Sequence, residues 1–478
     1  MSKTTLLQFT LSLTSMMSFS CARADVAGER SQFRSSNGLN ESCVRLSSMP
    51  GAKYSSKDIE TEKEFCAIDL SASNVAMCPK TWSTSPGTMI YDTEGTSQSN
   101  YEATRCAGKN GHKKLAKFKS TMNSENTSST FSTSSLLYYH FSRYFNTTVD
   151  VPVSVYRSID KDVHFERVSK HAVGSGRMNP AAWSVMRAAE LNPSSYGSAI
   201  DELFTADRKQ IYGILLKDKG TGYGPEIDGT EEHGWGTGSN NDFQETPAFL
   251  ALRSEKELRS AINEGVAQGI QNSIIRKAMG PGVSAEQMVY WMKEITEFTL
   301  LDYIFSQQDR IQNIDYVWEW TYIDGSGVKS VKVKDERYEK LSRPSMAKIP
   351  VPSEIAAFKP LLLQRTSIGD NDAGGRVQYT NFTKKTQMLE KIRHYNAETY
   401  RTLISLNKDL SAQGPVFSHV ASTFGLTAKQ IAQIVSNTAS ATAILKSTCE
   451  AGLMRFDLNP KKFFVGQVGE ESVNCANP

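Results

Sequence analysis

A long apolar helix that leads directly into a pair of opposite charges is the feature that most constrains this 478-residue chain. Ser284 and Gln287 have the spacing of an N-terminal capping box, and apolar residues then recur at helical spacing between residues 288 and 305. This pattern predicts one buried helix. Asp309 and Arg310 follow it, so a rigid element would hold the Asp309 carboxylate with its oxygens facing a cleft.

A carboxylate held in this way suits a residue that accepts or orients the proton of a substrate hydroxyl. Asn313 lies one turn further on and can turn its amide oxygen to a metal ion, and Asp315 is a rival for that role. The alternative is structural. Asp309 and Arg310 would then form an ion pair that simply ends the helix.

A second acidic motif begins at Asp370, after apolar residues 360–363 that are predicted to form a strand. It reads Asp370-Asn371-Asp372-Ala373 and continues with two glycines. Magnesium that bridges phosphates takes one or two carboxylates besides water and phosphate oxygens, so Asp370 is a candidate metal ligand. The alternative is a surface turn made by Asx residues and glycine.

A basic strand is predicted at residues 113–119. Because successive side chains of a strand alternate between its two faces, Lys117 and Lys119 point to the same side. Either lysine could hold the phosphates of a nucleotide. A solvent-facing basic strand is the alternative.

The predicted elements change in kind along the chain. Other strands are expected at 89–91, 101–106, 149–156 and 210–216, with a hairpin turn at 108–111 and a helix at 134–145. Residues 220–243 are glycine-rich and acidic, which is typical of a mobile loop. Helices are expected beyond it at 254–268, 387–407 and 427–448, and a hairpin at 318–333 that turns at 324–327.

The first 24 residues have the pattern of an export signal: Lys3, a mostly apolar stretch, and a small-x-small cleavage site. A lipid-bearing Cys21 is an alternative. Six cysteines remain beyond the signal, four between residues 43 and 106 and two near the C-terminus, and pairing inside each cluster is the simplest arrangement. We expect an irregular, disulfide-tied region at 25–87 and an exported protein, either secreted or periplasmic.

The composition excludes some partners. A formal net charge of +3 is too small to indicate nucleic acid. No later stretch is long and apolar enough to predict an integral membrane span.

Several motifs together resemble the atypical protein kinases. They are Phe118-Lys119, residues 135–145, residues 151–157, the Gln-Gln-Asp-Arg run that ends in Arg310, and Asp370-Asn371, and they occur in the order found in those kinases. The pattern is similar to secretory-pathway kinases of casein-like proteins, and to the HipA-like and type II phosphatidylinositol 4-kinase-like groups. It covers roughly residues 88–450.

The resemblance implies an α+β, two-lobed, atypical kinase-like fold, with a small lobe at 88–224 and a mainly helical large lobe at 225–478. It implies transfer of the γ-phosphoryl group of ATP, with Mg²⁺ or Mn²⁺, to a hydroxyl on a protein, glycan or lipid. Asp309 would be catalytic, Asp370 and Asn313 would bind the metal, and Lys119, with Lys117 as rival, would bind the nucleotide.

The chain also departs from the family. The glutamate that pairs with the nucleotide lysine is replaced by Ser134-Ser135-Leu136, so that partner is missing or comes from Glu102 or Glu125. Two alternatives are therefore retained. One is a pseudokinase-like binding module, and the other is a disulfide-stapled surface or adhesion protein whose aspartate-rich loops bind Ca²⁺.

Overall fold

The computed structural model describes residues 26–106, 113–124, 126–176, 178–217, 220–467 and 469–476. The predicted export signal at 1–24 with its Cys21, the predicted turn at 108–111 and the proposed lysine partner Glu125 lie outside the described residues.

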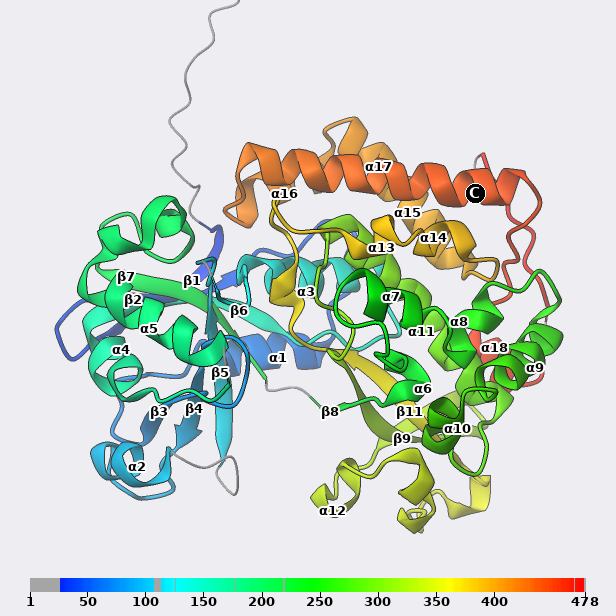
Figure 1. Ribbon diagram of the computed structural model, residues 1–478, viewed down its shortest axis with the longest axis horizontal. Helices are drawn as coiled ribbons and strands as arrows, with labels where there is room; N and C mark the ends of the chain where they lie inside the picture. The colour runs from blue at the N-terminus through cyan, green and yellow to red at the C-terminus, as the bar shows by residue number, and fades with distance from the viewer. Residues whose placement is uncertain are drawn as a thin grey trace, which may run out of the picture.

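The described chain combines helices with two sheets (Figure 1). The larger sheet has seven described strands, and every neighbouring pair is antiparallel. In spatial order its strands are β1 (Gly28–Arg34), β2 (Asn40–Leu46), β6 (Ser154–Asp160), β7 (Gln210–Leu216), β5 (Lys114–Ser120), β4 (Thr88–Asp92) and β3 (Val75–Pro79).

Strand β7 lies in the middle of the large sheet, and the side chains on both of its faces are buried. Ile214 and Leu216 belong to the main hydrophobic core, while Ile211 and Leu215 belong to the core on the other face. Gly213 lets β5 approach closely, since a Cβ there would lie 2.1 Å from the carbonyl oxygen of the β5 residue Lys119. The tight pairing fixes the strand that carries the two predicted nucleotide lysines.

The second sheet has the order β10-β9-β11, with β8 added against β9. The predicted hairpin is confirmed, since β9 and β10 pair on either side of its turn. Helix α11 packs against β11 through Gln287, whose amide exchanges two hydrogen bonds with the Gln364 backbone, of 2.8 and 2.7 Å. The bounds are β8 (Thr221–Gly222), β9 (Ile314–Asp324), β10 (Gly327–Lys332), β11 (Leu361–Ile368) and α11 (Ala285–Phe305).

Helix α11 is the predicted buried helix, and its side chains from Gln287 to Phe305 are all buried. Ser284 caps it by accepting from the Gln287 amide. The full capping box is not formed, because the side chain of Gln287 is engaged with β11 instead. Ser306, in the left-handed conformation, ends the helix.

Most of the other helices lie beside these two sheets, with α17 along one edge of the molecule (Figure 1). They are α1 (Ser56–Phe65), α2 (Gln98–Arg105), α3 (Thr133–Phe145), α4 (Lys161–Arg167), α5 (Met178–Leu191), α6 (Pro225–Asp228), α7 (Thr237–Phe243), α8 (Pro247–Leu252), α9 (Leu258–Gly269), α10 (Ser273–Met279), α12 (Glu336–Glu339), α13 (Phe382–Lys385), α14 (Met388–Lys391), α15 (Ala397–Ser411), α16 (Pro415–Thr423), α17 (Ala428–Glu450) and α18 (Pro460–Phe464).

Several expectations about the elements were wrong. Residues 28–79 are not irregular, because they supply three strands of the large sheet and helix α1. The strand expected at 101–106 is part of α2, and the loop at 220–243 contains β8, α6 and α7. The helix expected at 387–407 is divided into α14 and α15. Helix α9 is capped by Glu257 rather than by Ser254.

The cysteines pair as expected within their clusters. The disulfides of the described chain are Cys43–Cys66, Cys78–Cys106 and Cys449–Cys475. The first joins β2 to the residue after α1, and the third joins α17 to the C-terminal segment. Among the helices of the described residues, none has the length and apolar character needed to cross a bilayer.

Candidate functional site

Strand β5 places Lys117 and Lys119 on one face, and both side chains are buried. A buried ammonium group needs a compensating partner. Asp370 Oδ1 is that partner for both lysines, at 2.7 Å from Lys119 Nζ and 3.8 Å from Lys117 Nζ. The structure thus brings together three of the residues that the sequence singled out.

Asp372 is a further carboxylate of the same cluster, and its Oδ1 lies 2.6 Å from Lys119 Nζ. Burial disfavours the charged ammonium, but the two carboxylates overcome this effect and raise the pKa of Lys119 above its ordinary value. The two carboxylates therefore favour the charged form of Lys119. Sequence reasoning had noted Asp372 in the motif without giving it a role.

Local backbone geometry puts both carboxylates within reach of the lysine. Asp370 follows β11 and adopts the left-handed conformation, with a φ of 46°. A single-turn 3₁₀ helix, Asn371–Ala373, comes next. Gly375 has a φ of 74°, and a Cβ there would lie 3.1 Å from the Cβ of Ser134 on α3. The glycine allows the loop to lie directly on the helix.

Arg310 fastens the end of α11 to this loop. Its guanidinium pairs with Asp302 through Nε and Nη2, both at 2.9 Å, and donates to the Gly369 carbonyl at 2.9 Å and to Asn371 Oδ1 at 2.8 Å. The structural alternative for the Asp309-Arg310 pair is therefore half right. Arg310 forms a structural ion pair, but its partner in that pair is Asp302.

Asp309 lies beside this cluster and is half-buried. Burial raises its pKa, and the negative charges of Asp370 and Asp372 raise it further. Its Oδ1 accepts a hydrogen bond of 2.9 Å from the indole nitrogen of Trp235, which partly opposes the shift. Sequence reasoning missed Trp235, since its segment shows no periodicity.

The two other candidates for the metal role differ in position. The Asn313 amide nitrogen donates to the Asp309 carbonyl oxygen at 2.8 Å, so its amide oxygen is directed away from that carbonyl. Asp315 is buried in β9, near the buried Asp228 of α6, whose pKa is raised by burial and by neighbouring carboxylates. Asn313 is thus tied to the Asp309 backbone, whereas Asp315 belongs to a neighbouring acidic group.

Glu102, one of the two glutamates considered as a partner of Lys119, is engaged elsewhere. Glu102 pairs with Arg167 at 2.6 Å and accepts a hydrogen bond from the Met77 amide. Both of these partners belong to the large sheet and its helices. On α3 the expected glutamate position faces the loop through Ser134. Asp370 and Asp372 compensate the charge of Lys119.

Few side chains at this site could bind a metal ion. Across the described residues, no group of three or more His, Cys, Asp or Glu side chains is arranged to hold one. Asp370 supplies a carboxylate oxygen and Asn313 an amide oxygen, which are the hard ligands that Mg²⁺ or Mn²⁺ prefers. This small set of ligands suits a metal ion for which water and phosphates supply most of the coordination. It does not suit a Ca²⁺ site made of protein ligands alone.

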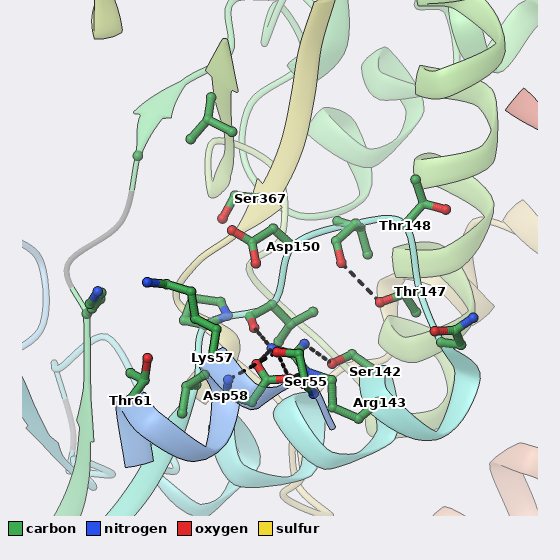
Figure 2. Close-up of a pocket in the computed structure, with 18 of the residues that line it drawn as sticks. Ser55, Lys57, Asp58, Thr61, Ser142, Arg143, Thr147, Thr148, Asp150 and Ser367 are labelled. Carbon is green, nitrogen blue, oxygen red and sulfur yellow. Dashed lines mark hydrogen bonds and ion pairs between the residues drawn. The ribbon is translucent and has the colours of Figure 1, made fainter. Parts of the chain in front are cut away.

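A cavity of about 570 Å³ lies at the other end of α3 (Figure 2). Its base holds the ion pair of Asp58 with Arg143, and Asp150 and Ser367 lie across from it. None of Lys117, Lys119, Asp309, Asn313 and Asp370 lines it. It is therefore separate from the carboxylate and lysine cluster.

A buried group of Thr88, His164 and Glu190 also resembles a catalytic site. His164 Nε2 lies 2.7 Å from Thr88 Oγ1, and its Nδ1 contacts Glu190. The exposed fractions of Thr88, His164 and Glu190 are 1%, 2% and 0%. Because a substrate cannot reach these groups, they stabilise the packing of α4 and α5 on the large sheet.

Comparison with known proteins does not add to this geometry. No family model matches the chain, and no curated protein is significantly similar to it in sequence.

Proposed function

We propose that this protein is an exported, ATP-dependent phosphotransferase of the atypical kinase class. The observation that carries the proposal is the ion pair of Lys119 with Asp370 and Asp372, in the immediate surroundings of Asp309. These groups come from three distant segments, and Arg310 joins two of them. A cation and several carboxylates gathered at one place are parts that phosphoryl transfer needs.

The proposal assigns a role to each group. Lys119, with Lys117 behind it, would hold the phosphates. Asp370 and Asn313 would hold Mg²⁺ or Mn²⁺, which neutralises the charge that develops on the phosphoryl oxygens when bound. Asp309 would orient the acceptor hydroxyl.

Asp309 also receives the proton. The acceptor oxygen forms a bond to the γ-phosphorus, the bond to the leaving oxygen of ADP breaks, and the hydroxyl proton passes to Asp309 and then to solvent. The raised pKa makes Asp309 a better proton acceptor than an ordinary aspartate, because the affinity for the proton rises with pKa. The acceptor is a hydroxyl on a protein, glycan or lipid.

The proposed compartment rests on the cysteines. Three disulfides in the described chain support an oxidising environment, and the predicted signal at 1–24 agrees with it. A protein kinase there needs ATP, which favours a secretory pathway or a host compartment over the open periplasm.

A second function is a pseudokinase-like binding module. It is favoured by one observation: both Asp370 and Asp372 are engaged by Lys119, so the metal ligand must give up part of an ion pair before a metal ion binds. Such a module would bind a nucleotide or a partner without turnover.

Measurements of thermal shift and ATP consumption on residues 25–478 distinguish the phosphotransferase from the binding module. We expect ATP with Mg²⁺ or Mn²⁺ to raise Tm by about 3 °C or more at saturating concentrations, with release of ADP and autophosphorylation. Asp370→Ala should lose both effects. Asp162→Ala, which removes an exposed aspartate of α4, is the matched control.

Each other outcome has a defined meaning. Metal-dependent nucleotide binding without turnover would favour the binding module. If nucleotide neither shifts Tm nor is consumed, both proposed functions are contradicted. A shift with Ca²⁺ alone would support the adhesion alternative instead.

A further inference from the structure

Trp235 is an unusual neighbour for a carboxylate that must receive a substrate. Its indole Nε1 donates to Asp309 Oδ1 at 2.9 Å, although 69% of its surface is exposed. Its other described ring contact is edge-on to Phe382, with ring centroids 5.4 Å apart. The side chain thus lies on the surface with its polar edge turned inward to the carboxylate.

The hydrogen bond from Trp235 to Asp309 is of the same kind as the one that the hydroxyl of a phosphoryl acceptor would form. A hydroxyl oriented by Asp309 must donate its proton to a carboxylate oxygen at hydrogen-bond distance. The indole N–H makes the same kind of donation, and an indole can only donate. While it is in place, Oδ1 cannot receive the hydroxyl of a substrate along the same direction.

We infer that Trp235 is a built-in cap that occupies the acceptor position on Asp309 and is displaced when a hydroxyl-bearing acceptor binds. This inference rests on the proposed function. It makes Trp235 an autoinhibitory residue of the same site, and the rate of phosphotransfer would then depend on how readily the indole leaves.

The backbone around Trp235 suits such a movement. Gly234 and Gly236 flank it with φ values of 71° and 81°, a region that favours glycine. A Cβ at Gly236 would lie 3.0 Å from the Phe382 ring, so the indole is carried by a backbone that only glycine fits.

The ends of the capping segment are fixed. The His233 amide donates to Asp242 Oδ2 of α7 at 3.1 Å, and the His233 ring pairs with the same carboxylate. On the other side, the Ser239 amide donates to the Gly234 carbonyl at 2.6 Å. Rotation of the Trp235 side chain would therefore break one hydrogen bond and one ring contact while the segment keeps its anchors.

The contact can be tested without any measurement of turnover. The chain has six tryptophans, and the indole ¹⁵N–¹H signal of Trp235 is identified by its loss in Trp235→Phe. We expect that signal to shift in Asp309→Asn at constant pH, because the variant replaces the carboxylate that accepts the indole hydrogen bond. A signal that does not respond to Asp309 would overturn the cap.

The inhibitory role needs a kinetic readout. Trp235→Phe keeps an aromatic ring but removes the donor, so kcat/KM for a hydroxyl acceptor should rise by about threefold to tenfold, with the KM for ATP unchanged. Trp82→Phe is the matched control, and Tm of both variants checks the fold.

A failure of the Trp235 cap can be distinguished from a failure of the proposed function. An active wild type whose Trp235→Phe variant has equal or lower kcat/KM would overturn the cap and leave the proposed function intact. If neither the wild type nor Trp235→Phe transfers phosphate or binds nucleotide, the proposed function fails and the inhibitory role fails with it.

Discussion

Lys119 Nζ and Asp372 Oδ1 lie 2.6 Å apart although 253 residues separate them in the chain. Asp372 is almost completely buried, so the ion pair is shielded from solvent. A buried charge that loses its partner is costly, which makes this contact a structural support as well as the centre of the candidate site. Function and stability therefore depend on the same side chains.

Lys119→Met tests whether stability and nucleotide binding both depend on this ion pair. We expect the free energy of unfolding to fall by about 3–5 kcal/mol, because two carboxylates would remain beside each other without their main cation. Nucleotide-dependent thermal shifts should disappear. Urea denaturation at neutral pH measures the first effect, and Lys114→Met, at an exposed position of the same strand, is the control. Equal stability of the two variants would contradict the buried ion pair.

Arg310→Lys tests the link between α11 and the acidic loop. Lysine keeps the charge but cannot reproduce the bidentate pair with Asp302 together with the bonds to Gly369 and Asn371. We expect a loss of about 2–3 kcal/mol in stability and faster amide hydrogen exchange in residues 369–375. Arg337→Lys changes an exposed arginine and serves as the control. Unchanged exchange would show that the loop is held by other contacts.

The sequence predicted the parts of this site that periodicity controls. Strand alternation correctly placed Lys117 and Lys119 on one face, and helical spacing predicted α11 because nearly all of its side chains are apolar or tightly packed. The disulfides could be paired because the cysteines fall into two separate clusters. These predictions depend on local pattern alone.

The remaining parts depend on contacts that no local pattern contains. Strand β1 is mostly exposed and joined to β2 by backbone hydrogen bonds, so it has no apolar alternation to recognise. The left-handed turn at Asp370, which brings Asp372 to Lys119, is a tertiary feature. Trp235 reaches Asp309 from a glycine-rich segment that has no period at all.

The C-terminal disulfide gives a third prediction. Cys449 and Cys475 close a loop across a sequence separation of 26 residues, which in the chain-entropy account contributes about 3 kcal/mol. The double variant Cys449→Ser, Cys475→Ser should lose about that much stability in urea and keep its nucleotide binding, because neither residue contacts the candidate site. Loss of nucleotide binding in a folded double variant would show that α17 supports the site.

Glu294 gives a prediction about pH. It is buried in α11, where its carboxylate pairs with Arg365 at 2.8 Å and accepts from the Thr366 amide at 3.0 Å. Burial outweighs these favourable contacts and raises the pKa of Glu294 to about 7. The folded state therefore holds this proton more tightly than the unfolded state does. The stability that the proton contributes is fully present below the ordinary carboxyl pKa, and is lost as pH rises toward 7 and above.

Glu294→Gln isolates this effect, because the amide keeps an acceptor for Thr366 and Arg365 retains Glu319 at 3.2 Å. Between pH 4.5 and 8, the wild type should lose about 3 kcal/mol of unfolding free energy relative to the variant. Urea titrations of both proteins at several pH values measure the difference. A difference that stays constant across this range would mean that Glu294 is ionised throughout, and that its ion pair with Arg365 overcomes burial.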